Sequence, residues 1–197
     1  MLRRATILPA LALLIAWTPA HAATALASFA AGCYWCVESD FDKVKGVVET
    51  TPGFMGGKTE NPTYSEVSSG ATGHTEVVII KYDPAVVTYQ QLLDHYWVNV
   101  DPLDLDGQFC DRGSQYRPEI FVYDDEQRKL AEASKKAIED SKRFKEPLVV
   151  AITKASAFTP AHDPDFYKTN SVRYKFYRAG CGRDARLKQL WGDKAGH

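Results

Sequence analysis

The chain has 197 residues, a formal net charge of −1, 45% apolar residues and four cysteines. This length fits one domain that is large enough to bury a hydrophobic core. A nearly neutral, slightly acidic chain without basic clusters gives no reason to expect nucleic acid or an anionic membrane surface as a partner. We therefore look for a small-molecule or peptide substrate.

The first 22 residues have the pattern of a secretory signal peptide. Arg3 and Arg4 form a basic start, an apolar run covers 7–17, and Ala20-His21-Ala22 is an Ala-x-Ala cleavage site. The run is short for a membrane span, which needs about 20 residues, but an uncleaved anchor is the alternative. Cleavage removes two arginines and no acid, so the formal charge moves from −1 to −3. We expect a periplasmic or secreted protein with a single domain over 23–197.

The first elements of this domain surround a Cys-x-x-Cys motif. An apolar run at 27–31 predicts a strand, and a helix follows, because apolar residues recur four and three positions apart at Val37, Phe41 and Val44. Gly32 permits the turn between them, since glycine adopts backbone angles that other residues avoid. The helix therefore begins close to the first cysteine of the motif.

That cysteine, Cys33, is the first candidate for a functional residue. Unpaired backbone N–H groups and the helix dipole at a helix N-terminus favour a thiolate, so we expect a lowered pKa and a nucleophile. Tyr34 and Trp35 follow at once, which suits a substrate with an apolar group beside its reactive atom. The alternative interpretation is a buried structural cysteine with two core aromatic residues.

The remaining elements alternate unevenly, which predicts a two-layer α+β domain. The region 101–117 looks irregular and is long for a passive connection, and such loops are often functional. Thr88 is a good N-cap for the helix that follows it. Further strands are expected at 47–51, 75–82, 120–123 and 148–152, and further helices at 89–98, 125–144 and 184–191.

Four short motifs follow one another in the chain: Gly32-Cys33-Tyr34-Trp35, Asn61-Pro62-Thr63-Tyr64, Thr72-Gly73-His74-Thr75-Glu76 and Gly113-Ser114-Gln115-Tyr116-Arg117. In this order they resemble the A-type peptide methionine sulfoxide reductases, which have Gly-Cys-Phe-Trp, Asn-Pro-Thr-Tyr, Thr-Gly-His-x-Glu and Gly-Thr-Gln-Tyr-Arg. The likeness runs from about Ala27 to Trp191. It implies a ferredoxin-like α+β core and reduction of the S epimer of methionine sulfoxide, free or in oxidised proteins. We expect a monomer without metal or cofactor.

The resemblance also implies the roles of individual residues. Cys33 would attack the sulfoxide sulfur, and Tyr34 and Trp35 would form an apolar wall against the methyl group of the substrate. The further roles are protonation of the sulfoxide oxygen by Glu76, hydrogen bonds to that oxygen from Tyr64 and Tyr116, and orientation of the site by Asp111. A general acid needs a pKa raised by apolar surroundings, and an apolar run follows Glu76 directly; an exposed strand-end glutamate is the alternative.

A nucleophilic cysteine that takes the oxygen becomes a sulfenic acid, which condenses with a second thiol. Cys36 is one helical turn away, whereas Cys181 lies between two glycines in the tail, where family members commonly place this residue. Both stay candidates, because four cysteines pair in three ways. Cys110 adjoins Asp111 and is either near the site or a small core residue. The resemblance implies a thioredoxin-like reductant that restores the thiols.

The sequence departs from the family pattern at three places. Tyr34 replaces phenylalanine, Cys36 replaces a common glycine, and the stretch 160–167 is a shortened form of a family segment. Two rival functions remain. An exported thiol–disulfide oxidoreductase would use Cys33 and Cys36, and a structural zinc site would require a second closely spaced pair of ligands, which the chain lacks.

Overall fold

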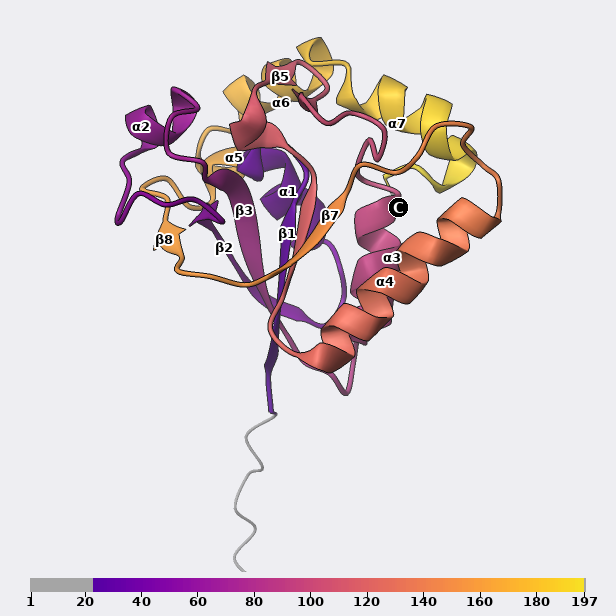
Figure 1. Ribbon diagram of the computed structural model, residues 1–197. Coiled ribbons are helices and arrows are strands. Elements are labelled where there is room, and N and C mark those ends of the chain that lie inside the picture. The colour runs from indigo at the N-terminus through magenta and orange to yellow at the C-terminus, as the bar shows by residue number, and fades with distance from the viewer. Residues whose placement is uncertain (1–22, 197) are drawn as a thin grey trace, which may run out of the picture.

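The computed structural model describes residues 23–196. The signal peptide expected at 1–22, and residue 197, lie outside the described residues. A six-stranded sheet crosses the molecule in the order β7-β6-β1-β3-β2-β8 (Figure 1). Its strands are β1 (Ala25–Ala30), β2 (Val47–Met55), β3 (Thr75–Tyr82), β6 (Glu119–Val122), β7 (Ala151–Lys154) and β8 (Thr159–Pro160).

Helices and a small hairpin complete the described part of the chain. The helices are α1 (Tyr34–Phe41), α2 (Tyr64–Ser68), α3 (Tyr89–Trp97), α4 (Asp125–Asp140), α5 (Phe166–Thr169), α6 (Ser171–Gly180) and α7 (Arg183–Trp191), with short 3-10 helices η1 (Ser114–Tyr116) and η2 (Gly192–Lys194). The hairpin pairs β4 (Gly107–Gln108) with β5 (Asp111–Arg112). None of the helices described between 23 and 196 is both long and apolar enough for a transmembrane segment.

The central elements have the ferredoxin-like arrangement. Along the chain they are β1-α1-β2-β3-α3-β6, and β1 lies between β6 and β3, antiparallel to both. The added strand β7 runs parallel to β6, and β8 extends the other edge beside β2. This is the split βαβ topology, and it confirms the predicted two-layer α+β core.

The core lies between the sheet and the helices α1 and α3. Phe29 of β1 stacks on Tyr96 of α3 and Phe41 of α1, with ring centroids 4.9 and 5.2 Å apart. The helix α3 is fixed at its start by a capping box, in which Thr88 and Gln91 bond to each other's backbone N–H groups. The confirmed predictions of β3 and α3 thus rest on a continuous apolar run and on a strong cap.

Some predicted boundaries were wrong for identifiable reasons. The helix expected to reach residue 144 ends at Asp140, because Lys142 takes a left-handed backbone conformation (φ +55°) and Phe144 turns inward onto Trp191. The strand expected from 148 begins at Ala151, since the Val149 N–H bonds to the loop carbonyl of residue 102 instead of to the sheet.

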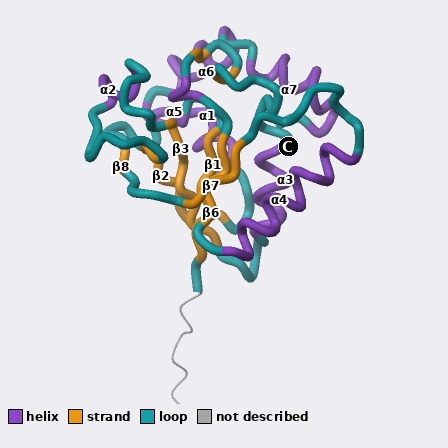
Figure 2. Tube along the Cα trace, in the orientation of Figure 1, coloured by secondary structure: helices purple, strands orange, loops and turns teal. Residues whose placement is uncertain are grey.

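The C-terminal third covers one end of the sheet. The helices α5, α6 and α7 gather above the end of β1, next to the hairpin β4–β5, while α3 and α4 lie along the side of the sheet (Figures 1 and 2). The ten-residue helix α6 was not predicted. Strand β1 ends and antiparallel β3 begins at this same end, so the cysteine motif and Glu76 are brought together there.

Candidate active site

Cys33 occupies the turn between β1 and α1, at the N-cap position of the helix. Gly32 before it has a φ of +84°, and a Cβ atom at this glycine would lie 2.6 Å from the Cβ of Gln108. A side chain would therefore be excluded both by the backbone conformation and by the close approach of the β4 strand. The predicted strand, glycine turn and helix start are confirmed.

Glu76 is buried beside this turn, with 2% of its surface exposed. Its carboxyl group accepts a hydrogen bond from the backbone N–H of Tyr34 at 2.9 Å. Burial raises the pKa of Glu76 to about 8, although the bond from Tyr34 acts in the opposite direction. The predicted burial is confirmed, and the carboxyl group carries a proton at neutral pH, as a general acid must.

The pKa of Cys33 is not lowered as the helix position suggested. The thiol is buried, and this burial, a hydrogen bond to Cys36 and the nearby carboxyl of Glu76 raise its pKa well above the ordinary value. Desolvation therefore outweighs the field of an eight-residue helix. The hydrogen bond from Cys33 instead lowers the pKa of Cys36, with further help from Arg183 and Arg178.

Tyr64 and Tyr116 approach the same carboxyl from two different loops. Tyr64 is the first residue of α2, and Tyr116 ends the 3-10 helix η1. Burial and the neighbouring charge of Glu76 raise the pKa of both phenols. The two hydroxyl groups consequently stay protonated and able to donate at physiological pH.

Asp111 lies at the edge of the site and is held by a residue that the sequence analysis missed. The hydroxyl of Tyr177, on the unpredicted helix α6, donates to the carboxylate of Asp111 and also lies within hydrogen-bonding reach of the Cys33 sulfur. Burial raises the pKa of Asp111, while the bond from Tyr177 lowers it. Nothing in the spacing of the tyrosine-rich tail distinguishes Tyr177 from its neighbours.

The two aromatic residues after Cys33 are fixed by a single acid. Asp163 accepts hydrogen bonds from the Tyr34 hydroxyl at 2.7 Å and from the Trp35 indole N–H at 3.1 Å. The indole also stacks on Phe166, with ring centroids 3.8 Å apart. Asp163 and Phe166 were not predicted, and both come from the shortened stretch 160–167. They hold the proposed apolar wall in one orientation.

The other two cysteines form a disulfide, Cys110–Cys181. Cys110 is exposed, so its alternative as a small core residue was wrong. Cys181, a candidate resolving residue, has no thiol in this state, and the free thiols are those of Cys33 and Cys36. The sulfurs and Asp111 lie within 4.8 Å of one another, as metal ligands would, but a disulfide offers no thiolate to a metal.

Two further residues of the motifs have structural roles. The buried His74 accepts a hydrogen bond from the Gly57 N–H at 3.2 Å and donates to the Thr59 carbonyl at 2.8 Å. Arg117 bonds to the carboxylate of Glu119 at 2.9 Å and to two loop carbonyls. Both therefore hold the loops around the site.

Comparisons with known proteins agree with this geometry. The family model described as peptide methionine sulfoxide reductase matches residues 25–195. The peptide methionine sulfoxide reductase MsrA of Bacillus licheniformis is 48% identical over 171 residues, covering 86% of this chain and 94% of that one. The MsrA of Bacillus pumilus is 45% identical over 172 residues, covering 86% and 97%.

Solved structures show the same fold. Methionine sulfoxide reductase A of Corynebacterium diphtheriae has a TM-score of 0.65 at 28% identity, over 80% of this chain and 78% of that one. Reduced Mxr1 from Saccharomyces cerevisiae has a TM-score of 0.70 at 24% identity, over 80% and 91%. From the family match over 25–195 and the identity to relatives, the chain belongs to the peptide methionine sulfoxide reductase family and is an oxidoreductase that acts on methionine sulfoxide.

Proposed function

We propose that the protein reduces the S epimer of methionine sulfoxide, free or in proteins, with Cys33 as nucleophile and Glu76 as acid. The observation that carries this proposal is the buried carboxyl group with its raised pKa, which is placed beside the cysteine turn by the bond from Tyr34. The preference for the S epimer follows from the resemblance to the A-type enzymes. The apolar wall of Tyr34 and Trp35 receives the methyl group of the substrate.

The first half-reaction moves an oxygen atom and two electrons. The Cys33 sulfur attacks the sulfoxide sulfur while Glu76 gives its proton to the oxygen, which Tyr64 and Tyr116 hold by hydrogen bonds. The S–O bond of the substrate breaks and the protonated oxygen passes to the Cys33 sulfur, while the transient S–S bond between Cys33 and the substrate also breaks. Methionine leaves, and Cys33 becomes a sulfenic acid. The proton lost from the thiol restores the carboxyl group of Glu76, so no further reactant is needed in this step.

The second half-reaction is assigned to Cys36. Its sulfur attacks the sulfur of the Cys33 sulfenic acid, a Cys33–Cys36 disulfide forms, and water leaves. The assignment is supported by the hydrogen bond between the two thiols and by the engagement of Cys181 in its disulfide with Cys110. A thioredoxin-like dithiol then restores the thiols; yeast Mxr1, a structural neighbour, has been solved in complex with Trx2.

The test is single-turnover reduction of each sulfoxide epimer by protein whose Cys110–Cys181 disulfide is intact. We expect one S-sulfoxide consumed and two thiols lost per molecule. Cys33→Ser abolishes the reaction, and Cys181→Ser leaves it unchanged. Cys36→Ser still yields one methionine but stops at a sulfenic acid that a 1,3-dione traps. No methionine but rapid disulfide exchange would favour the alternative thiol–disulfide oxidoreductase.

We also propose that the protein is exported and acts as a monomer in an oxidising compartment. The support is the leader pattern at 1–22, together with a disulfide between residues 71 positions apart. Such bonds persist outside the cytosol. N-terminal sequencing after cell fractionation tests this proposal: a mature start near Ala23 in the exported fraction is expected, and an intact leader in the membrane fraction would indicate an anchor instead.

A further inference from the structure

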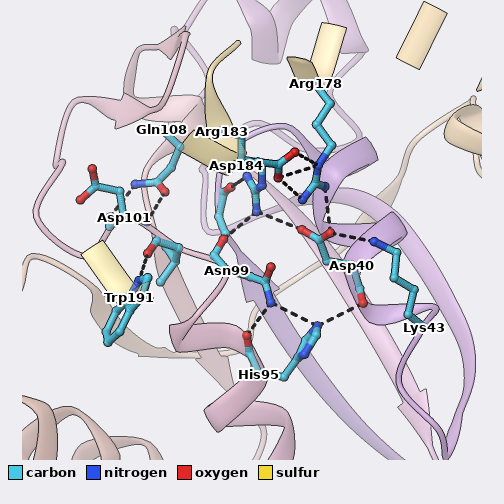
Figure 3. Close-up of polar contacts among 12 residues, drawn as sticks. Asp40, Lys43, His95, Asn99, Asp101, Gln108, Arg178, Arg183, Asp184 and Trp191 are labelled. Atoms are coloured by element: carbon cyan, nitrogen blue, oxygen red, sulfur yellow. Dashed lines mark hydrogen bonds and ion pairs between the residues drawn. The ribbon is translucent and has the colours of Figure 1, made fainter. Parts of the chain in front are cut away.

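A buried cluster of charged residues lies beneath the first turns of α1. We call Asp40, Arg178 and Arg183 the arginine cluster (Figure 3). Arg183 is only 2% exposed, and its guanidinium group donates to the carbonyls of Ala31 at 2.9 Å and Asn99 at 2.7 Å. It thereby lies against the chain segment that leads from β1 into the cysteine motif.

The cluster reaches Cys36 through helix geometry. Asp40 follows Cys36 by four positions on α1, so the two side chains share a face of the helix. Arg178 contacts one carboxylate oxygen of Asp40 at 2.8 Å, and Arg183 contacts the other at 3.4 Å. Both guanidinium groups are consequently on the side of the helix that carries the Cys36 sulfur.

Positive charge predominates in the buried part of this cluster. Asp40 is 3% exposed and is shared by two arginines, whereas the second acid on Arg178, Asp184, is 64% exposed and largely screened by water. Near Cys36 two cations thus face one buried anion. An anionic sulfur at this position is stabilised by the surplus positive charge.

The charge felt by the Cys36 sulfur depends on the titratable and charged groups around it. Besides Cys33, these groups are Asp40, Glu76, Tyr174, Tyr177, Arg178 and Arg183. The tyrosines are neutral at physiological pH and Glu76 carries its proton there, so Asp40 is the principal opposing charge. The lowered pKa of Cys36, after the bond from Cys33, reflects Arg183 and Arg178.

We propose that Arg178 and Arg183 are positioning residues that make Cys36 the leaving sulfur when the Cys33–Cys36 disulfide is reduced, so that the external dithiol attacks Cys33. The inference rests on the proposed resolution by Cys36. A low-pKa thiol leaves faster in thiol–disulfide exchange. Cys33 is also the more exposed residue of the pair, with 9% of its surface accessible against 2% for Cys36.

The exchange balances as follows. A thiolate of the dithiol attacks the Cys33 sulfur, a mixed disulfide forms, and the electron pair of the broken S–S bond passes to Cys36 as a thiolate beside the arginine cluster. The second thiol of the reductant then attacks the reductant's first sulfur, which is bonded to Cys33 in the mixed disulfide. Cys33 leaves as a thiolate and takes up a proton, and the reductant becomes a disulfide.

The first experiment locates the mixed disulfide. Oxidised enzyme is treated briefly with glutathione as a monothiol probe, quenched with an alkylating agent, and cut by a protease that cleaves after aromatic residues, which separates the two cysteines at Tyr34 or Trp35. We expect glutathione on Cys33 and the alkyl group on Cys36. The reverse pattern overturns the inference, whereas the absence of any Cys33–Cys36 disulfide in untreated oxidised enzyme overturns the proposed function on which it rests.

The second experiment tests whether the charges of the arginine cluster set the pKa of Cys36, with variants that remove either a positive or a negative charge. In a Cys33→Ser background with Cys110–Cys181 intact, Cys36 is the only thiol that titrates, and its thiolate is followed by ultraviolet absorbance. Arg178→Met should raise the pKa of Cys36, Asp40→Asn should lower it, and Arg178→Lys should largely restore it. Lys175→Met, which removes an exposed charge from the same helix, is the matched control and should leave it unchanged.

The same variants, with Cys33 present, link this charge to turnover. We expect Arg178→Met to slow reduction of the Cys33–Cys36 disulfide by dithiothreitol about three- to tenfold, because leaving-group rates follow thiol pKa. Single-turnover reduction of the sulfoxide should change less. A purely structural role predicts that Arg178→Met and Asp40→Asn shift the Cys36 pKa in the same direction, and that result would overturn the inference.

Discussion

At the scale of single residues, Glu76 shows how burial prepares an acid. Its pKa of about 8 means that the single-turnover rate stays high up to that pH and falls above it, as the carboxyl group loses its proton. Glu76→Gln cannot donate, so we expect a rate lowered by roughly 10²- to 10⁴-fold without this alkaline decline. Rapid-quench kinetics between pH 6 and 10 measure both effects. An unchanged alkaline limb in the variant would assign the decline to another group.

The same shift has a consequence for stability. The folded state binds the Glu76 proton more tightly than the unfolded chain does. The contribution of this proton to the free energy of unfolding is therefore complete below pH 4.5 and is lost as pH rises toward 8. Urea unfolding at pH 5 and pH 8 should therefore show a decline in the free energy of unfolding. This decline should be smaller by a few kcal/mol in Glu76→Gln. Equal declines would show that Glu76 does not titrate in this window.

Asp163 is the residue on which the proposed substrate wall depends. Asp163→Ala removes the acceptor for both the Tyr34 hydroxyl and the Trp35 indole. Since hydrogen bonds to a charged group contribute about 1.5–3 kcal/mol, we expect KM to rise by at least about tenfold. Tyr34→Phe loses only one of the two bonds and keeps the bond that orients the Trp35 indole, so its KM should rise less than that of Asp163→Ala. Equal effects of the two variants would mean that the indole bond does not hold the wall.

At the scale of elements, two capping boxes of the same design serve different purposes. Thr88 caps α3, whose buried face lies in the core, whereas Thr63 caps the five-residue α2, which begins with Tyr64. Thr88→Ala should lower the free energy of unfolding by about 1 kcal/mol with little effect on kinetics. Thr63→Ala should slow sulfoxide reduction instead, because it loosens the start of α2 and with it the Tyr64 hydroxyl, the proposed donor to the sulfoxide oxygen. Urea unfolding and single-turnover rates of both variants distinguish these outcomes.

Elements with strong local patterns could be predicted from the sequence, and those defined by tertiary contacts could not. The continuous apolar run of β3 and the cap of α3 were sufficient to identify these elements. By contrast, the large apolar residues Val172 and Phe176 of α6 are exposed, so the apolar positions of its sequence do not mark its buried face. Because α6 was missed, the position of Tyr177 near Cys33 could not be foreseen.

The candidate site likewise has residues that local sequence motifs could predict and properties that depend on tertiary contacts. The motifs were enough to nominate Cys33 and Glu76, and the apolar run after Glu76 correctly indicated its burial. The predicted lowering of the Cys33 pKa was wrong, because the depth at which the thiol is buried depends on α6 and on the β4–β5 hairpin. The local sequence pattern does not reveal these contacts. The pairing of Cys110 with Cys181 likewise depends on where α6 ends.

At the scale of the whole molecule, the Cys110–Cys181 disulfide joins the irregular region at 101–117 to the junction of α6 and α7. It closes a loop across 71 positions of sequence, for which chain entropy alone predicts about 4 kcal/mol of stabilisation. Cys181→Ser should therefore lower the urea midpoint while single-turnover reduction persists. Loss of the second thiol equivalent in this variant would instead give Cys181 a part in resolution.

The same covalent loop changes what a cut in the backbone would do. The segment after α4 carries exposed basic residues, among them Lys142 and Lys145, and lies between the two cysteines of the disulfide. A tryptic nick there would leave Cys33, Glu76 and Asp111 on one fragment and Tyr177 on the other, still tied together beside the site. We expect a nicked protein that migrates as one species without reductant and retains sulfoxide reduction, whereas nicked Cys181→Ser should separate in denaturant. The enzyme would then work as two chains joined by one bond.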